Sequence, residues 1–377
     1  MKKNKILFTG YYGFKNTGDD MFGLISSWGS NYYWNISNTA LLSNKGVSSD
    51  KVPIKFALSK NKYFKGQYIV QNYYEILNSE YIIFAGGSIL NSKPKGSSSP
   101  RNLISFLSKS KILNVGAIGV SLGPFKSDKD FEYIKEILYY FKFLVLRDKV
   151  SYNLALKMNL PYKPVLGADL AFLLPKFISV SNYNIERDIN NKERIMGISL
   201  CHYERYSSLE NIDNENRRED RIFELLELLK KDDNLKFKFF IINGNSKTGD
   251  IEITDNFIKR LSLREDRYEL IPYNHNTIEV ISKIVECNLV FSVRLHSAIF
   301  SATQNIPSLL VEYHPKCKDY LDDIGVSDKY RIGDMNINVI DIVSKIYSIL
   351  DKEPCNFYPK KEELIRLSEK NFLDENI

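Results

Sequence analysis

The sequence predicts an α/β protein built from two Rossmann-like domains that face a cleft. A chain of 377 residues is too long to fold around one hydrophobic core, since domains commonly hold about 150 residues. Short apolar runs alternate with helix-period segments from one end to the other, which is the pattern of a parallel sheet covered by helices on both faces. One polar stretch, residues 177–194, interrupts this alternation.

The first half carries one complete α/β series. Its expected strands are 5–9, 55–58, 81–85, 112–120 and 143–146, and its expected helices are 20–28, 101–109, 130–141 and 149–157. We therefore place an N-terminal domain at residues 1–178.

After the polar linker a second series begins, and it extends to residue 355. Its expected strands are 195–200, 237–242, 269–271, 289–293 and 308–312, and its expected helices are 217–230, 251–263, 277–286, 297–304, 316–323 and 339–350. A last helix at 360–372 falls in the segment 356–377, which we expect to pack back on the first domain.

Composition and charge exclude several classes of protein. The chain is 44% hydrophobic and 26% charged, and its 52 Lys and Arg against 46 Asp and Glu give a net charge of +6 that is spread along the sequence. Such a modest excess suits anionic small molecules or the inner face of a membrane. Nucleic acid, which needs a concentrated basic stripe, is not an expected partner.

The cysteines and the apolar runs indicate where the protein works. Four cysteines without metal-ligand spacing are expected to be free thiols in a reducing compartment: Cys201, Cys287, Cys317 and Cys355. No run approaches the ~18 apolar residues that span a bilayer. We expect a cytoplasmic protein whose contact with the inner membrane is at most peripheral, and the oligomeric state stays open.

Arg294 and His296 are the first candidates for a functional site. The buried run 289–293 predicts a strand and residues 297–304 predict the next helix, so the pair lies at the carboxyl end of a strand. Ligands of open α/β sheets bind at that edge, and a guanidinium beside an imidazole suits a carboxylate or phosphate substrate. A satisfied core histidine is the competing interpretation for His296.

Glycine-rich turns follow three other strands. The first, from Gly10 to Asp19, is able to cap a helix and to offer its N–H groups to an anion. Gly86-Gly87 and Gly123-Pro124 close the others, and an ordinary turn explains each of them equally well. The spacing matches neither a dinucleotide fingerprint nor a phosphate-binding P-loop, so chemistry with nicotinamide or ATP is disfavoured.

Charged residues at further strand ends are weaker candidates. Arg147 and Asp148 follow the strand 143–146, where a salt bridge or a helix cap is an equally good explanation. Asp169 lies inside an apolar run, so it must be hydrogen-bonded or functional. Lys316 adds a cation after the strand 308–312. The four histidines lack metal-ligand spacing, so no metal site is expected.

These residues occur in the order seen in one known family. The motifs are Gly10 to Asp19 with Asn16, Gly86-Gly87, Gly123-Pro124, Arg147 to Ser151, Asp169 to Phe172, Arg294-Leu-His296 and Tyr313 to Lys316. Together they resemble the polysaccharide pyruvyltransferase family from about residue 6 to residue 325. Ser88, where a third glycine is common, and Asp20, where Glu is more usual, are mild departures.

The resemblance implies a GT-B-like arrangement and transfer of pyruvate from phosphoenolpyruvate to two sugar hydroxyls, with release of phosphate and no cofactor. The donor would lie in the second domain and the acceptor, a sugar on a lipid-linked or free glycan, in the first. By motif match, Arg294 and His296 fall on donor-binding and catalytic positions. A carboxylate is expected to assist the hydroxyls, and the sequence does not choose between Asp148, Asp19 and Asp169 for this base. Further substrate contacts would be Arg147, Lys316, Asn16, Asp19, Gly86, Gly87 and Asp169.

Two other functions remain open at this stage. A GT-B glycosyltransferase that uses a nucleotide sugar would share the architecture and the anion-rich second domain. A carbohydrate-binding protein without catalysis would keep the fold without turnover. The acceptor sugar and the positions of the ketal on it cannot be read from the sequence.

Overall fold

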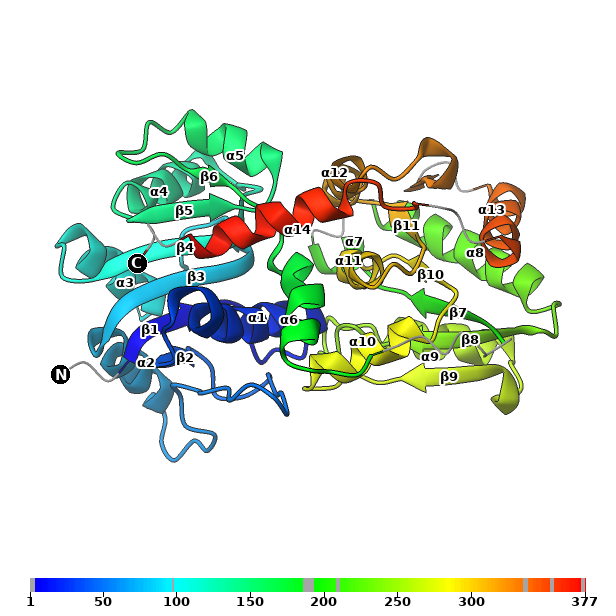
Figure 1. Ribbon diagram of the computed structural model, residues 1–377, viewed down its shortest axis with the longest axis horizontal. Coiled ribbons are helices and arrows are strands. Elements are labelled where there is room, and N and C mark those ends of the chain that lie inside the picture. Colours follow the sequence, from blue (N-terminus) through cyan, green and yellow to red (C-terminus); the bar gives the residue numbers. More distant parts are fainter. Residues whose placement is uncertain are drawn as a thin grey trace. The chain divides into compact units, whose positions relative to one another are not determined.

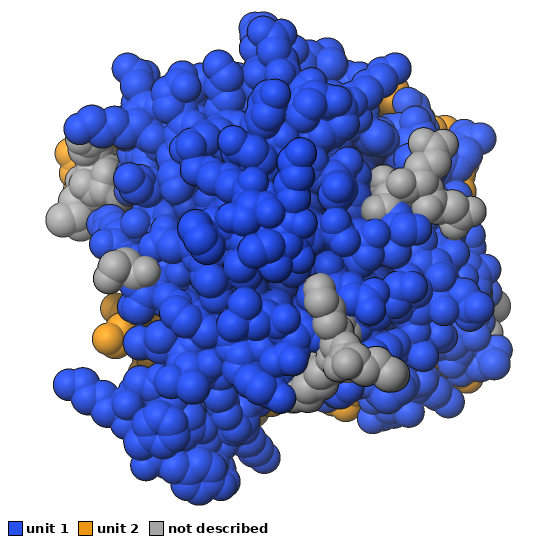
Figure 2. All heavy atoms as spheres, turned by 90° about the vertical axis from the view of Figure 1, so that its left-hand side faces the viewer, with its two compact units in different colours: residues 1–14, 18–182, 363–377 blue, residues 15–17, 183–362 orange. Residues whose placement is uncertain are grey.

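In the computed structural model the chain forms two compact units. Unit 1 comprises residues 1–14, 18–182 and 363–377, and unit 2 comprises residues 15–17 and 183–362 (Figure 2). The structure describes residues 4–96, 98–185, 193–207, 211–334, 338–352, 356–373 and 377.

A parallel six-stranded sheet in the order β2-β1-β3-β4-β5-β6 forms the centre of unit 1 (Figure 1). Its strands are β1 (Asn4–Thr9), β2 (Thr39–Leu41), β3 (Ser79–Leu90), β4 (Asn114–Leu122), β5 (Phe143–Leu146) and β6 (Val165–Leu166). The strands β4 and β5 are buried along almost their whole length, as expected where helices cover both faces of a parallel sheet.

Helices cover both faces of this sheet. They are α1 (Thr17–Trp34), α2 (Gln67–Leu77), α3 (Pro100–Lys109), α4 (Asp128–Leu138), α5 (Lys149–Leu156), η1 (Leu170–Leu173), α6 (Leu174–Val180), α14 (Lys361–Glu369) and η5 (Lys370–Phe372). Helices α2 to α5 share one hydrophobic core with the sheet, to which Ile76, Ile104 and Ile134 belong. Side-chain caps set some helix starts, as where Ser127 accepts from the N–H of Asp130.

Unit 2 repeats the plan with a second parallel six-stranded sheet, in the order β12-β11-β10-β7-β8-β9. Its strands are β7 (Arg194–Ser199), β8 (Leu235–Phe240), β9 (Tyr268–Ile271), β10 (Leu289–Ser292), β11 (Ser308–Glu312) and β12 (Ile332–Gly333). The central strands β7 and β10 are almost fully buried. Their carboxyl ends therefore share one edge of the sheet with the ends of β8 and β11.

The helices of unit 2 connect these strands. They are α7 (Glu204–Ser207), α8 (Ile212–Leu229), α9 (Ile251–Leu261), η2 (Glu265–Arg267), α10 (Thr277–Val285), α11 (Leu295–Thr303), α12 (Pro315–Ile324), η3 (Asp328–Tyr330) and α13 (Val339–Asp351). Asn276 caps α10 through its side chain, and Gly325 ends α12 in the left-handed conformation that a glycine adopts without strain.

The two parallel sheets confirm the predicted α/β class, but some elements differ from the expectation. The prediction of a strand at 55–58 is wrong. Strand β2 takes the edge position, and Phe56 makes only an isolated bridge to Leu41. Pro53 lacks an N–H for a ladder there, and polar residues follow Leu58. Helix α2 was not foreseen, and Phe177 lies inside α6 rather than in a linker.

Three cysteines, Cys201, Cys287 and Cys317, are buried free thiols, whereas Cys355 lies outside the described residues, as does the linker segment 186–192. None of the helices in the described part of the chain is long and apolar enough to cross a membrane.

The C-terminal segment packs onto helix α1 within unit 1. The ring of Phe372 stacks on Tyr33 at a centroid distance of 5.3 Å, and it fills the space where a side chain at Gly29 would be. The indole N–H of Trp34 donates to the carbonyl of Leu373 at 3.0 Å. In addition, the amide of Asn371 donates to the carbonyl of Ala168 at 3.0 Å, so this segment also supports the loop before η1.

We therefore expect Phe372→Ala to lower the free energy of unfolding by about 3 to 5 kcal/mol, the usual cost of removing a buried phenylalanine ring. Chemical denaturation of the full chain measures this loss. Lys370→Ala is the matched control, because that side chain is exposed in the same short helix. Equal losses in the two variants would contradict the packing role of Phe372.

Candidate functional site

The sheet edge of unit 2 holds the pair that the sequence singled out. Arg294 follows β10 and is the last residue before α11, and His296 is the second residue of that helix. Strand β10 lies between β11 and β7, so residues that follow these three strands are neighbours at the edge. The structure thus places Arg294 and His296 at the carboxyl end of a central strand, as the pattern predicts.

A buried carboxylate holds the guanidinium of Arg294 in place. Its Nε donates to Oδ1 of Asp250 at 2.9 Å, and its Nη2 donates to the same oxygen. The other oxygen of Asp250 accepts from the backbone N–H of Asn243 at 2.8 Å. Asp250 is fully buried immediately before α9. The pair therefore ties the end of β10 to the loop after β8.

Burial alone would lower the pKa of Arg294, because it penalises the charged guanidinium. Cys201 and Asp250 act in the opposite direction and raise this pKa above its usual value. Burial raises the pKa of the Cys201 thiol to about 11, so Cys201 is a neutral thiol near neutral pH. The site consequently presents a permanent cation.

Lys316 and His314 come from the next strand end, after β11. His314 precedes α12, and its Nδ1 accepts from the backbone N–H of Lys316 at 3.1 Å. Burial, helped by the positive charge of Lys316, lowers the pKa of His314 to about 4. His314 is thus a neutral cap that fixes the start of the helix on which Lys316 lies.

Asn16 belongs to unit 2, although the glycine-rich turn around it belongs to unit 1. It forms an antiparallel bridge with Asn243, the residue whose N–H contacts Asp250. The carbonyl of Lys15 accepts from the N–H of Gly244 at 2.7 Å, and the N–H of Thr17 donates to the carbonyl of Ile242 at 2.9 Å. Backbone pairing therefore places Asn16 beside the loop that carries Asp250.

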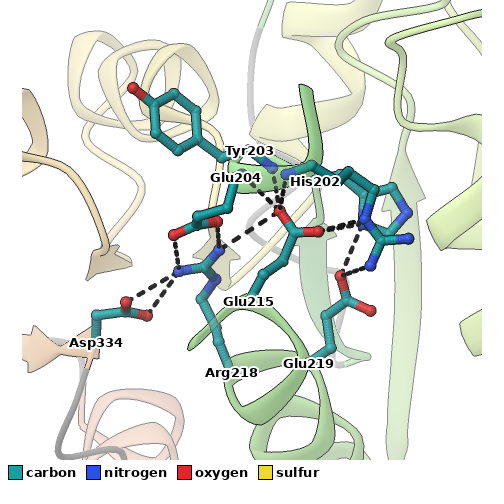
Figure 3. A network of polar contacts seen from close by, with 8 residues as sticks. His202, Tyr203, Glu204, Glu215, Arg218, Glu219 and Asp334 are labelled. Carbon is teal, nitrogen blue, oxygen red and sulfur yellow. Dashed lines mark hydrogen bonds and ion pairs between the residues drawn. The ribbon is translucent and has the colours of Figure 1, made fainter. Parts of the chain in front are cut away.

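Unit 2 also contains a network of charged side chains around Arg218 and Glu215, which Figure 3 shows. Its centre is Arg218 of α8, which is almost fully buried and pairs with Glu204 and, at 3.0 Å, with Asp334. The guanidinium also lies over the ring of Tyr313 at 5.1 Å. Because Tyr313 directly precedes His314, this network supports the turn that leads to Lys316.

Glu215 fixes the start of α7 in the same network. One of its oxygens accepts from the backbone N–H groups of Tyr203 at 2.6 Å and Glu204 at 2.7 Å. Burial would raise the pKa of Glu215, but these donors and the side chain of Arg205 lower it to about 2. The carboxylate therefore stays ionised and anchors the loop that follows β7.

Metal binding at this network is disfavoured by its own charges. Among the described residues, His202, Glu215 and Glu219 bring ligand atoms within 4.8 Å of one another. However, the guanidinium of Arg205 already contacts both carboxylates, at 3.3 Å for Glu219. It supplies the positive charge that a metal ion would bring, so we assign no metal to this group.

In unit 1 the candidate residues form a second cluster at a sheet edge. Arg147 follows β5; its Nη1 pairs with Asp169 at 2.6 Å, and its Nε donates to Oγ of Ser121 at 2.7 Å. Asp169 also caps η1 by accepting from the N–H of Ala171 at 3.0 Å. Both charged side chains are largely buried, so the pair fixes the ends of three neighbouring strands, β4, β5 and β6.

Asp148 has a structural task in this cluster. Its carboxylate caps α5 by accepting from the N–H of Ser151 at 2.7 Å, and it also accepts from the hydroxyls of Ser121 at 2.6 Å and Ser151 at 3.0 Å. Ser121 thus links Asp148 to the guanidinium of Arg147.

Gly86 and Gly87 lie where β3 passes the start of α1. Gly86 has a φ of +75°, and a Cβ there would lie 2.2 Å from the ring of Phe22. A Cβ on Gly87 would lie 3.6 Å from Oδ1 of Asp19. The two glycines therefore allow helix α1, with Asp19 in its first turn, to approach the strand closely.

Sequence reasoning missed Asp250, Arg218 and Glu215, which hold the predicted residues in place. One signal was available: Arg218 stands at helical spacing with the buried residues Ile222, Leu225 and Leu229. A charged residue on the apolar face of a helix indicates a buried ion pair. Asp250 lies 44 positions before Arg294, and no local pattern connects the two.

Solved structures with the same fold define the class of protein. The UDP-GlcNAc 2-epimerase of Methanocaldococcus jannaschii has a TM-score of 0.59 and 12% identity, covering 96% of this chain and 98% of that chain. MnaA of S. aureus, solved with UDP, scores 0.57 at 10% identity, covering 97% and 91%. HepE of Anabaena in complex with UDP-glucose scores 0.54 at 10% identity, covering 98% and 96%. The chain therefore has the predicted GT-B-like fold, made of two Rossmann-like domains.

Within this class, residues 31–315 match the model of the polysaccharide pyruvyl transferase family. The chain belongs to that family and is a transferase, as the order of the motifs predicted. The match includes Arg147, Arg294 and His296, whereas Asn16 and Lys316 lie outside it. A search among curated proteins finds no match by sequence.

The lowered pKa of His314 gives a pH prediction. Histidine in an unfolded chain titrates near 6.5, whereas the folded value is about 4. Between these values the unfolded chain binds a proton that the folded chain does not, so this residue destabilises the fold as pH falls from about 6.5 to about 4. We expect an imidazole NMR signal with a midpoint near 4 that is missing from His314→Asn. A midpoint near 6.5 would overturn the assignment.

Proposed function

We propose that this protein transfers pyruvate from phosphoenolpyruvate to two hydroxyls of one sugar in a bacterial surface polysaccharide or its lipid-linked precursor. The product is a cyclic pyruvate ketal, and phosphate is released. Membership of the polysaccharide pyruvyl transferase family supports the reaction type. The observation that carries the proposal lies at the end of β10. There Asp250 holds the guanidinium of Arg294, and His296 follows Arg294 two residues later in the sequence.

The charges at this edge suit a small, highly anionic donor. Among the described residues, Asp250 accepts one hydrogen bond from Nε and one from Nη2 of Arg294, which leaves the two N–H groups of Nη1 and the second N–H of Nη2 to be offered to an anion. The first N–H groups of α11 and the ammonium of Lys316 add positive potential at neighbouring strand ends. We assign the carboxylate and phosphate of phosphoenolpyruvate to these groups.

The chemistry then needs one proton donor. His296 protonates the methylene carbon of phosphoenolpyruvate, and C2 becomes an oxocarbenium-like centre. One sugar hydroxyl attacks C2 and passes its proton to a carboxylate base. The C2–O bond to phosphate then breaks, and the second hydroxyl bonds to C2 and closes the ketal while its proton leaves with the phosphate. General acid catalysis of this kind contributes about 10²- to 10⁴-fold. The reaction needs no cofactor, and we propose none.

We assign the acceptor sugar to the edge cluster of unit 1. There Ser121 links Arg147 to Asp148, Arg147 pairs directly with Asp169, and Asp19 lies beside Gly87. Carboxylates and hydroxyls in fixed positions are suited to bind sugar hydroxyls and to accept their protons. Because phosphoenolpyruvate is made in the cytoplasm, we place the reaction there.

A nucleotide-sugar transferase is the second candidate, since HepE of Anabaena was solved with UDP-glucose on the same fold. The two functions release different products. Incubation with phosphoenolpyruvate and a panel of lipid-linked and aryl glycosides should give free phosphate and an acceptor with the added mass of a pyruvate ketal. Release of a nucleotide from a sugar nucleotide, with no phosphate from phosphoenolpyruvate, would favour the second candidate.

His296→Ala should reduce phosphate release from phosphoenolpyruvate by about 10²-fold or more, because the general acid is lost. The KM for phosphoenolpyruvate should change little, since Arg294 and Lys316 remain. His275→Ala is the matched control, because that imidazole is exposed in the same unit. Turnover of a folded His296→Ala protein near the wild-type rate would sink the assignment.

Arg294→Lys should raise the KM for phosphoenolpyruvate by about tenfold or more. A planar guanidinium is able to contact Asp250 through one edge and a bound anion through another. The compact ammonium of lysine has no such separate edges. Arg264→Lys, at an exposed ion pair with Asp266, is the control for the loss of a guanidinium. Saturation curves measured as phosphate release decide this, and an unchanged KM would contradict the proposed role.

A further inference from the structure

One side of unit 1 exposes an apolar stripe along helix α2. The helix buries Ile76 in the core of the unit, whereas Val70, Tyr74 and Leu77 are 60%, 55% and 55% exposed. Their spacings of four and three residues place these three side chains on one face of the helix. Single exposed apolar residues are ordinary, but a stripe of them along a helix indicates an interaction surface.

The apolar surface continues beyond α2. The segment that leads into the helix exposes Tyr63, at 79%, and Phe64. Helix α3 packs against α2, exposes Phe106, and is followed by the exposed Ile112. Figure 2 looks onto the side of unit 1 on which α2 and α3 lie in Figure 1. We call residues 59–77 together with 100–112 the α2–α3 surface.

Positive charge predominates around the α2–α3 surface, whose one acidic residue, Glu75, is buried. Residues 51–74 contain five lysines and no Asp or Glu, and residues 91–114 contain four lysines and one arginine, again without an acid. All five lysines of the first segment are exposed: Lys51, Lys55, Lys60, Lys62 and Lys65. Lys109 pairs with Glu136 of α4 at 2.6 Å, which marks the boundary of the basic zone.

We propose that the α2–α3 surface attaches the protein to an anionic bilayer. Exposed lysines attract anionic headgroups, while Tyr63, Phe64 and the stripe on α2 enter the boundary between headgroups and acyl chains. A second copy of the chain fits this surface poorly, because a two-fold contact would place two basic faces against each other. The attachment is peripheral, and it rests on observations independent of the proposed reaction.

Sedimentation of the full chain with vesicles tests the attachment. We expect the protein to pellet with equimolar phosphatidylcholine and phosphatidylglycerol and to stay in solution with phosphatidylcholine alone. Raising the salt from about 0.1 M to about 1 M shortens the screening length from about 10 Å to about 3 Å, and should release the protein. Equal pelleting with both kinds of vesicle would overturn the proposal.

Two sets of variants test the surface itself. The triple variant Lys60→Glu, Lys62→Glu and Lys65→Glu should weaken binding about tenfold or more, and Tyr63→Ser with Phe64→Ser should weaken it at constant charge. The matched control reverses three exposed lysines of unit 2: Lys231→Glu, Lys259→Glu and Lys352→Glu. The control should still bind, and all variants should keep the thermal stability and the turnover of a water-soluble glycoside.

Two results would contradict the assignment. Equal loss of binding in the control triple would mean that net charge, rather than this surface, attracts the vesicles. A dimer in light scattering that dissociates in Tyr63→Ser with Phe64→Ser, without vesicle binding by the wild type, would make a second copy the occupant of the surface.

Discussion

Both sheet edges depend on an ion pair between a largely buried arginine and a buried carboxylate. In unit 1 Arg147 pairs with Asp169, and in unit 2 Arg294 pairs with Asp250. Removing such charges from water costs several kcal/mol per ion, so each arginine keeps its place only while its carboxylate is correctly positioned. Each carboxylate in turn accepts a backbone N–H, from Ala171 in one case and Asn243 in the other. Each ion pair thereby fixes the position of its two side chains and of the loop that donates the backbone N–H.

This arrangement has a consequence for ligand binding. A guanidinium pre-positioned by a carboxylate loses little conformational freedom when an anion binds, so more of the interaction free energy is available for binding. The carboxylate also balances the charge in the absence of a ligand, which a lone buried arginine could not tolerate. Arg218 extends the principle to the next strand end, because its pairs with Glu204 and Asp334 hold its guanidinium against the ring of Tyr313. The cations at this edge are thus placed by anions that the ligand never needs to contact.

The sequence predicts the parts of this system that depend on local pattern. Buried apolar runs located β7 and β10, and the rule that ligands bind at the carboxyl ends of strands then located Arg294 and His296. Periodicity failed where an element depends on distant partners. The prediction of a strand at 55–58 was wrong, because β2 takes the edge position and pairs with β1. Asp250 was invisible because its partner is remote in the sequence and its own neighbourhood is a polar loop.

Basic residues serve two different physical purposes in this chain, and burial separates them. Arg294 is largely buried and its partner Asp250 is fully buried, so salt screens their pairing only weakly and its effect is local and geometric. Lys60, Lys62 and Lys65 are exposed, so their effect is a long-range field that salt weakens. Because the two groups of cations respond differently to ionic strength, the proposed attachment to a bilayer and the proposed binding of a small anionic donor are separable in one salt titration. If both activities fell together with salt, the exposed lysines would have to contribute to the donor site as well.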